Sequence, residues 1–159
     1  MRKPIIVGNW KMNLTHLEAI ALVQKLSYRL ESDVFDACEV VVCPSFTSLR
    51  SVQTTIDSDK MEISLGAQNV NENEKGAFTG EISAGMVKKL NCTYVLVGHS
   101  ERRQHCGETS EATAIKIRAV RKMEMTPILC VGETKEQREN GETTSIVEEQ
   151  VLKGLSSVS

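Results

Sequence analysis

Short apolar runs recur along the chain, and longer amphipathic stretches separate them. The runs are three or four residues long and lie at Ile5–Val7, Val40–Cys43, Ile63–Leu65, Tyr94–Val97 and Ile128–Val131. Their first residues are 23 to 35 positions apart, about the length of a βα unit. Strands that do not alternate apolar with polar residues are buried on both faces, which is typical of a parallel sheet with helical crossovers. The pattern therefore predicts an α/β fold with parallel strands.

Helix start signals lie between these runs. A Ser or Thr followed three residues later by Glu or Gln, the capping-box pattern, occurs at Thr15, Thr134 and Ser145. We expect a helix to begin after each of them, and Gly141 is placed to end the second. One face of the first helix carries three leucines at steps of four: Leu22, Leu26 and Leu30.

Polar residues follow the strands, and in a parallel α/β fold these ends meet on one face. Lys11 follows the first strand and His99 the fourth, which together suggest an active-site floor for an anionic substrate. A (β/α)₈ barrel takes about 250 residues, or roughly 31 per unit. The chain has 159 residues. We therefore predict one domain over residues 1–159, a parallel (β/α) TIM barrel truncated to about five of its eight units.

Composition excludes several classes of partner. The formal net charge is −2 and Lys and Arg are scattered, which argues against a surface for nucleic acid or anionic membranes. No apolar run approaches the ~20 residues that span a bilayer, and we expect no signal peptide at Met1–Pro4 because no long apolar stretch follows it. The five cysteines are odd in number and form no Cys-x-x-Cys pair. We expect a reduced, cytoplasmic protein.

Five segments together point to a known family. They are Gly8–Asn13, Gly66–Asn69, Gly76–Ser83, Gly98–Arg103 and Cys130–Glu133. In this order and spacing they closely resemble triosephosphate isomerase, from about residue 4 to the end of the chain. The resemblance implies interconversion of dihydroxyacetone phosphate and glyceraldehyde 3-phosphate through an enediolate, in glycolysis and gluconeogenesis, without cofactor or metal. Another phosphosugar barrel enzyme is the alternative, although it should lack this combination of motifs.

Lys11 is the first catalytic candidate. A lone lysine after a strand is usually solvated. Within the Asn-Trp-Lys-Met-Asn motif, the resemblance implies that its ammonium attracts the substrate and stabilises the enediolate charge. Asn9 is similar to the family's second substrate-contacting residue at this strand end.

His99 is the second catalytic candidate. An isolated histidine after a strand is commonly structural, but the Ser-Glu-Arg-Arg that follows can open a short helix. At the positive end of a helix a neutral imidazole is favoured, and it can donate a hydrogen bond to substrate oxygens. The resemblance makes His99 the electrophile that shuttles protons between those oxygens. His16, in the first turn of a helix, and His105, in a loop, are expected to have no such role.

Three neighbouring residues are expected to support the site. Glu101 could be the catalytic base or a structural carboxylate, and the resemblance favours a supporting residue near Lys11 and the partner's loop. Ser100 belongs to the same motif. Cys130 is expected to end a strand, where it packs behind the base or serves as an apolar core residue. Two further residues, Gln68 and Asn69, are expected to hold the floor in shape by hydrogen bonds.

The stretch Gln68–Thr79 is long and polar for a loop in a compact barrel. One interpretation is a mobile surface loop. The resemblance implies a dimerisation loop whose tip, around Phe78 and Thr79, lies beside the partner's active site. A homodimer is therefore expected for the full-length protein.

The family's remaining machinery is not within these residues. Its general base is a glutamate after the sixth strand, followed by a flexible lid and by glycine-rich turns that grip the phosphate. Because the chain stops at Ser159 after a helix, we expect a fragment that is inactive alone. The alternative to an enzyme is a half-barrel that self-associates or needs a complementing fragment, with apolar side chains exposed on strands Ile5–Val7 and Ile128–Val131.

Overall fold

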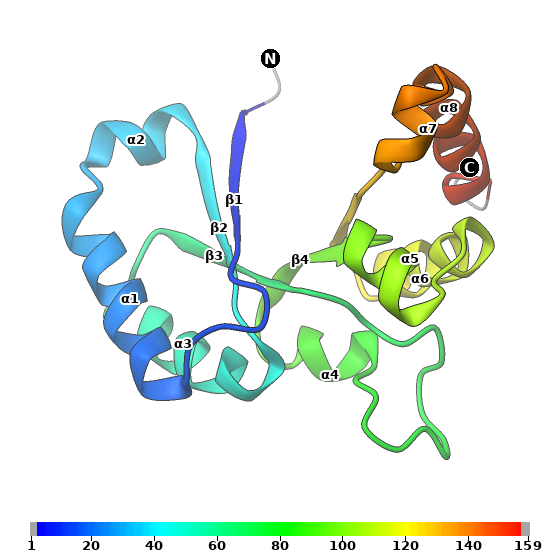
Figure 1. Cartoon of the computed structure of the whole chain (residues 1–159). Coiled ribbons are helices and arrows are strands. Elements are labelled where there is room, and N and C mark those ends of the chain that lie inside the picture. Colours follow the sequence, from blue (N-terminus) through cyan, green and yellow to red (C-terminus); the bar gives the residue numbers. More distant parts are fainter. Residues whose placement is uncertain (1–2, 157–159) are drawn as a thin grey trace. The chain divides into compact units, whose positions relative to one another are not determined.

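The structure, a computed structural model, describes residues 3–156, so the two chain ends discussed above, 1–2 and 157–159, lie outside the described residues. Each strand is followed by one or two helices along the described chain (Figure 1). The strands are β1 (Ile5–Asn9), β2 (Glu39–Cys43), β3 (Ile63–Ala67), β4 (Cys92–Val97) and β5 (Thr126–Leu129). The helices are α1 (His16–Arg29), α2 (Ser32–Ala37), α3 (Phe46–Ser58), α4 (Ala84–Lys88), α5 (Ser100–Cys106), α6 (Ser110–Lys122), α7 (Lys135–Glu139) and α8 (Thr143–Gly154).

The strands are hydrogen-bonded in the order β1-β2-β3-β4-β5, and the β1-β2, β2-β3 and β3-β4 pairs are parallel. All five predicted strands are confirmed. The last is displaced, because it ends at Leu129 rather than Val131. Cys130, predicted as the strand end, therefore lies just after β5, although its N–H still donates to Val97 O at 2.9 Å.

Contacts divide the chain into two compact units. Unit 1 comprises residues 1–68 and 86–95, and unit 2 comprises residues 69–85 and 96–159. The chain passes from one unit to the other at three points: after Gln68, within α4 between Gly85 and Met86, and within β4 between Val95 and Leu96. The prediction of one domain over residues 1–159 stays a prediction.

The core of unit 1 is built from β2, β3 and the helices that pack beside them. Helix α1 packs against α3, and α3 packs against β3. The buried side chains include Ala19, Val23, Val41, Leu49, Val52 and Leu65. The leucine face predicted for α1 is half-buried, while Ala19 and Val23 on the same helix are fully buried. The sequence pattern thus predicted the helix correctly, but it did not identify Ala19 and Val23 as its most buried residues.

The core of unit 2 lies around α6. This helix packs against both α8 and β5, and it buries Ala114, Ile117 and Val120. A Cβ added at Gly154, near the end of α8, would lie 3.1 Å from the Leu129 side chain. The absence of a side chain there lets α8 approach the strand closely.

Two of the three predicted helix starts are confirmed. Thr15 and Thr134 each complete a capping box with the residue three positions on. Gly141, with φ +77°, follows the end of α7 as predicted. The prediction for Ser145 is wrong, because α8 already begins at Thr143 and the Ser145 hydroxyl donates to the carbonyl of Glu142.

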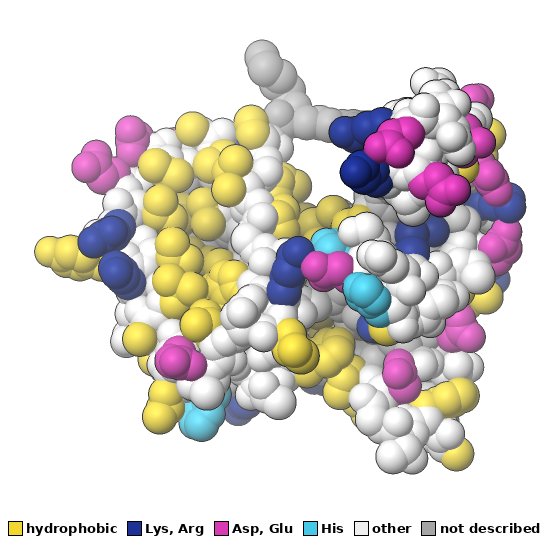
Figure 2. Space-filling view, in the orientation of Figure 1, with side chains coloured by type: hydrophobic (Ala, Val, Ile, Leu, Met, Phe, Trp, Pro, Cys, Tyr) yellow, Lys and Arg dark blue, Asp and Glu magenta, His cyan; other side chains and the backbone are white. Residues whose placement is uncertain are grey.

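Apolar side chains are exposed on β1 in unit 1. Ile6 is 61% exposed and Ile5 is 42% exposed, in contrast to the buried valines of β2. Figure 2 shows apolar side chains gathered on the surface of unit 1. The exposure predicted for the first strand is therefore confirmed. On the fifth run, Val131 is 40% exposed, just beyond the end of β5.

Candidate functional site

Asn9 ends β1, and Lys11 lies on the loop that follows it in unit 1. Lys11 has φ +55°, in the left-handed region that residues with a Cβ seldom adopt. Its N–H donates to Asn9 Oδ1 at 3.0 Å, which forms an Asx turn, and Asn13 Nδ2 donates to Trp10 O at 2.8 Å. Local side chains therefore shape this loop, and the Lys11 side chain is exposed beyond it.

Gln68 and Asn69 both make hydrogen bonds, and their predicted role in holding the floor in shape stays a prediction. Gln68, the residue after β3, donates from Nε2 to Lys11 O at 2.8 Å and to Cys43 O at 2.9 Å. Asn69 is buried in unit 2, where its Oδ1 accepts from Lys116 Nζ at 2.9 Å. The two neighbours thus act in different units.

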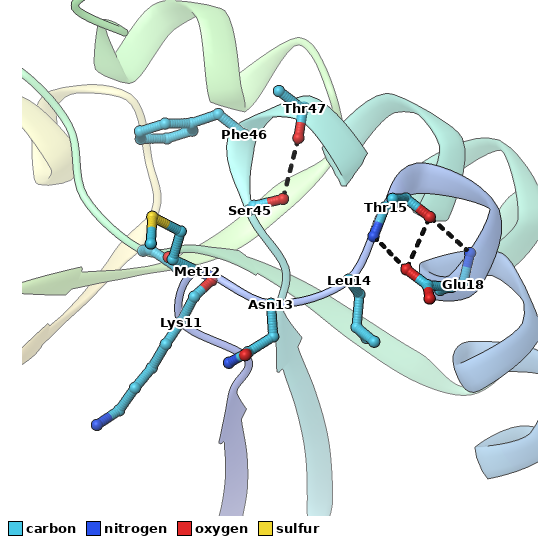
Figure 3. Close-up of a pocket in the computed structure, with 10 residues that line it drawn as sticks. Lys11, Met12, Asn13, Leu14, Thr15, Glu18, Ser45, Phe46 and Thr47 are labelled. Carbon is cyan, nitrogen blue, oxygen red and sulfur yellow. Dashed lines mark hydrogen bonds between the residues drawn. The ribbon is translucent and has the colours of Figure 1, made fainter.

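A pocket of about 530 Å³ opens beside the Lys11 loop in unit 1. Its lining combines this loop with the start of α3: Lys11, Met12, Asn13, Leu14, Thr15, Glu18, Ser45, Phe46, Thr47 and Gln68. In Figure 3 the Lys11 side chain extends away from Ser45 and Thr47, whereas Met12 lies toward Phe46. Met12 is 95% exposed. The pocket therefore offers apolar surface next to a cation.

His99 caps the N-terminus of α5 in unit 2. The helix predicted after it is present, and His99 is its N-cap residue. The sharp turn into the helix is made by Gly98, with φ +73°, where an added Cβ would lie 2.9 Å from Arg103 Nη2. His105, predicted in a loop, instead lies inside α5, which continues to Cys106. His16 is in the first turn of α1, as predicted.

One hydrogen bond and one close carboxylate surround Nδ1 of the His99 ring. Nδ1 accepts from the Glu101 N–H at 3.2 Å, so this nitrogen is unprotonated in that bond. The Glu101 carboxylate lies 3.5 Å from the same nitrogen, a distance at which an ion pair would require a protonated ring. We favour the backbone hydrogen bond, because N-cap acceptors commonly satisfy the free N–H groups of a helix. Nε2 is then the donor. Ser100 is exposed and opens the helix.

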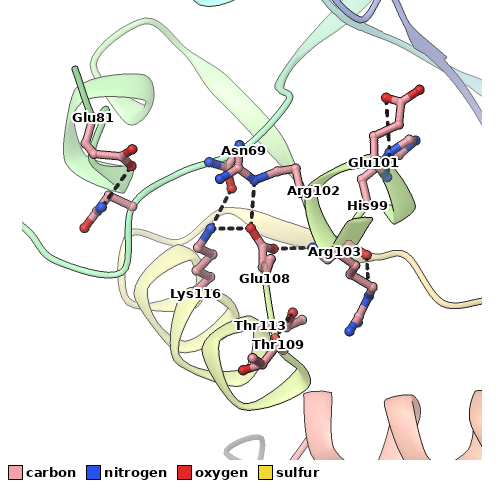
Figure 4. A network of polar contacts seen from close by, with 12 residues as sticks. Asn69, Glu81, His99, Glu101, Arg102, Arg103, Glu108, Thr109, Thr113 and Lys116 are labelled. Carbon is pink, nitrogen blue, oxygen red and sulfur yellow. Dashed lines mark hydrogen bonds and ion pairs between the residues drawn. The ribbon is translucent and has the colours of Figure 1, made fainter. Parts of the chain in front are cut away.

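A buried charged cluster in unit 2 was missed by sequence reasoning. The Glu108 cluster consists of Asn69, Arg102, Glu108 and Lys116. Glu108 Oε2 accepts from Lys116 Nζ at 2.6 Å and from Arg102 Nε at 2.7 Å, and Oε1 accepts from the Gly98 N–H at 2.9 Å. Figure 4 shows both cationic side chains directed at the carboxylate. The cluster thus supports the turn that carries His99.

The charges around Glu108 outweigh its burial. The side chain is only 3% exposed, and burial alone would raise the pKa of its carboxyl. Hydrogen bonds and positive charge from Lys116 and Arg102 hold that pKa below its usual range. One signal could have found the cluster, because Lys116 occupies the apolar face of α6 beside Thr113 and Ile117. A charged residue within such a stripe needs a buried partner.

The loop after β5 is held by a side chain from α8. Gln150 Oε1 accepts from the Gly132 N–H at 2.9 Å, and its Nε2 donates to Gly132 O at 3.1 Å. Glu133 accepts from Arg138 Nε at 2.6 Å. Cys130 is half-buried, and burial raises the pKa of its thiol even though the charge of Arg103 opposes this. Cys130 is therefore a packed thiol beside this loop.

The loop between β3 and α4 carries the predicted dimerisation tip. Its base is closed by the Asn71 N–H, which donates to Ile82 O at 2.7 Å, and by Asn71 Nδ2, which donates to Glu81 Oε2 at 2.9 Å. Phe78 is 45% exposed and Thr79 is exposed.

No group of three metal-ligating side chains was found among residues 3–156. The same residues contain no helix long and apolar enough to cross a membrane.

Comparison with known proteins gives consistent matches. The family model for triosephosphate isomerase matches residues 4–159. The triosephosphate isomerase of Saccharopolyspora erythraea is 56% identical over 159 residues, covering 97% of this chain and 60% of that protein. That of Streptomyces avermitilis is 54% identical, covering 99% and 61%.

A solved structure extends the likeness to the fold. The crystal structure of triosephosphate isomerase from Bartonella henselae matches with a TM-score of 0.85 at 30% identity, covering 96% of this chain and 62% of that one. The predicted fold, a parallel (β/α) barrel represented by five of its βα units, is thereby confirmed. The chain spans about 60% of the length of the curated relatives it matches.

Proposed function

The chain belongs to the triosephosphate isomerase family, and we propose that its activity is the interconversion of dihydroxyacetone phosphate and glyceraldehyde 3-phosphate. The observation that carries this proposal is the placement of His99 at the N-terminus of α5, with Nδ1 accepting from the Glu101 N–H. A neutral imidazole in this position has a single donor, Nε2–H. That donor suits a substrate whose two neighbouring oxygens exchange a proton.

The proposed reaction moves one proton between carbons and one between oxygens. A base removes the proton from one carbon of the triose, and the carbonyl oxygen gains negative charge as the enediolate forms. His99 donates from Nε2 to that oxygen and then takes a proton from the neighbouring hydroxyl oxygen. The proton returns to the other carbon, so atoms and charge balance over the cycle without a cofactor.

Lys11 supplies fixed positive charge in this proposal. Its exposed ammonium follows β1, and its backbone is held by hydrogen bonds on both sides. A charge fixed before the reaction stabilises the enediolate without reorganisation during the step. It also attracts the phosphate dianion of the substrate. Asn9 is proposed as a second substrate contact, although its Oδ1 accepts from the Lys11 N–H.

The carbon-bound proton requires a carboxylate outside these 159 residues. The family uses a glutamate after its sixth strand. Glu101 lies beside the non-reacting nitrogen of His99, at 3.5 Å, which supports a positioning role rather than that of the base. A positioned base contributes about 10²- to 10⁴-fold in rate. A polypeptide of these 159 residues alone is therefore expected to be inactive.

We also propose that the active protein is a cytoplasmic homodimer. The exposed Phe78 and Thr79 form the tip of one loop, and the 530 Å³ pocket beside Lys11 exposes Met12 and Phe46. An aromatic tip and an apolar pocket are complementary surfaces, of the kind that form the centre of protein interfaces.

The test compares the chain alone with a joined chain. In the joined chain, these 159 residues are followed by the C-terminal part of the Saccharopolyspora erythraea relative that lies beyond the matched region. We expect isomerase activity and a dimeric mass from the joined chain, and neither from the 159 residues alone. His99→Gln should remove most of the activity while leaving the dimeric mass unchanged. Activity of the 159 residues alone, or an active His99→Gln variant, would show that the base or the electrophile is misassigned.

A further inference from the structure

We propose that Gln68 is the positioning residue for Lys11, holding the left-handed backbone that presents the Lys11 ammonium. This inference rests on the proposed function for the role of Lys11. The placement of the loop by Gln68 does not depend on that function.

The Lys11 loop adopts a backbone that needs external support. Lys11 has φ +55° and Leu14, three residues on, has φ +70°. Neither is glycine, and for residues with a Cβ this region is unfavourable unless the surroundings enforce it. Strain of this kind is typical of functional sites. The side chains that bond the backbone here therefore decide where Lys11 lies.

Gln68 is the side chain that ties this loop to the sheet. Its Nε2 has two hydrogens, and it donates to two carbonyls, Lys11 O at 2.8 Å and Cys43 O at 2.9 Å. Cys43 is the last residue of β2, and its carbonyl also accepts from the Trp10 N–H at 3.1 Å. One carboxamide thus joins the ends of three neighbouring strands, β1, β2 and β3.

Gln68 lies at the end of a buried strand, so its side chain starts from a fixed position. It directly follows β3, whose last three residues are buried, and it is itself half-buried. It lies 57 residues from Lys11 in the chain, so the bond is a tertiary constraint rather than part of the local turn. The local part of the turn is the Asn9 bond to the Lys11 N–H. Asn9 thus bonds the N–H of Lys11, and Gln68 bonds the carbonyl oxygen of the same residue.

The chemistry of this position calls for a carboxamide. A leucine at position 68 fills similar space but donates nothing, and a glutamate would direct a charged oxygen at two carbonyl oxygens. In both cases the hydrogen bond from position 68 to the Lys11 carbonyl is lost, and the backbone can leave the left-handed region. A displacement of about 1 Å at a catalytic group can cost on the order of 10²-fold in rate.

The first experiment measures the backbone and needs no activity. The Lys11 Cα and Cβ chemical shifts, which report φ and ψ, are recorded by solution NMR for the 159-residue chain and its Gln68→Leu variant. Gln53→Leu is the matched control, because Gln53 is a buried glutamine of the same unit whose side chain, among residues 3–156, bonds within α3, to Arg50 and Asp57. We expect the shifts of Lys11 to change in Gln68→Leu and not in Gln53→Leu. Unchanged shifts in both variants would overturn the proposal.

The second experiment is a double-mutant cycle in the joined chain described above. Gln68→Leu is expected to lower kcat/KM by about tenfold or more when Lys11 is present, but by less than about twofold in a Lys11→Met background. A general structural role would give the same loss in both backgrounds and would overturn the proposal. If the joined chain lacked isomerase activity, the proposed function would fail, while the NMR result would still decide the placement of Lys11.

Discussion

The Lys11 loop and the Glu108 cluster each hold a lysine, but the first exposes its lysine and the second buries it. Lys11 is exposed on a backbone with φ +55°, and neutral hydrogen bonds from Asn9 and Gln68 hold that backbone. Lys116 is 8% exposed on a regular helix, and the Glu108 carboxylate neutralises its charge. The Lys11 loop adopts an unfavourable backbone conformation and exposes its charge to solvent. The Glu108 cluster buries a charge and pairs it with an opposite one.

The contrast indicates what each region is for. A buried ion pair gains little stability relative to apolar residues, but it is costly to break once present. A strained loop carrying an exposed cation contributes little to the core and is available for chemistry. We therefore expect changes in the Glu108 cluster to alter stability, and changes in the Lys11 loop to alter activity. The following predictions test that division.

The largest expected effect is on stability, in the Glu108 cluster. Glu108→Leu leaves the buried Lys116 ammonium with the neutral Asn69 Oδ1 but without its carboxylate partner, and it removes the acceptor of the Gly98 N–H. We expect a loss of about 3–5 kcal/mol in the free energy of unfolding, measured by urea denaturation of the joined chain. Adding Lys116→Met should recover part of that loss. Glu74→Gln, at the exposed ion pair with Lys122, is the control and should change stability far less.

The next effect is on catalysis, in the Lys11 loop. Lys11→Met keeps the length of the side chain but removes the charge, and we expect kcat/KM of the joined chain to fall by about 10²- to 10³-fold. The urea midpoint should stay unchanged, in contrast to Glu108→Leu. Lys25→Met, at an exposed lysine of α1, is the matched control and should remain active. Near-normal turnover in Lys11→Met would refute the role of Lys11.

The pH dependence of stability should separate the two regions further. The pKa of Glu108 is lowered in the folded protein from an ordinary value of 4.5. A lowered pKa contributes stability that is present above the unfolded value and is lost as the pH falls through the folded one. Unfolding of the wild type should therefore depend more steeply on pH below about 4.5 than unfolding of Glu108→Gln. Equal slopes for the two proteins would contradict the cause assigned to the pKa shift.

The smallest expected effect is on stability, at the cap of α1, which lies outside both regions and serves as a reference for the other variants. Thr15→Ala removes the side-chain cap of α1 and should cost about 1 kcal/mol of stability, measured by thermal unfolding. Ser145→Ala tests the cap that the sequence predicted and the structure does not use. Because Ser145 lies inside α8, its replacement should be nearly neutral. A loss as large as that of Thr15→Ala would mean that the α8 start was misread.

Local patterns in the sequence determined most of the fold. Five strands, two capping boxes and the glycine that follows α7 each depend on residues within a few positions of one another, so a single sequence shows them. The same is true of the position of His99 as a helix cap. The end of β5 was misplaced by two residues and the start of α8 by three, because side-chain patterns locate helices and strands more reliably than their ends.

Only the tertiary structure decided how the charges and the loop are held. Gln68 reaches Lys11 across 57 residues, and Asn69 reaches Lys116 across 47. In the sequence Glu108 is an ordinary carboxylate after a glycine, and nothing near it shows that it is buried. Burial and long-range hydrogen bonds arise when distant segments pack. The apolar stripe around Lys116 indicates that this lysine needs a buried partner, but it does not indicate which residue that partner is. The sequence alone thus determined which residues stand at the strand ends, while packing decided which of them are strained, paired or exposed.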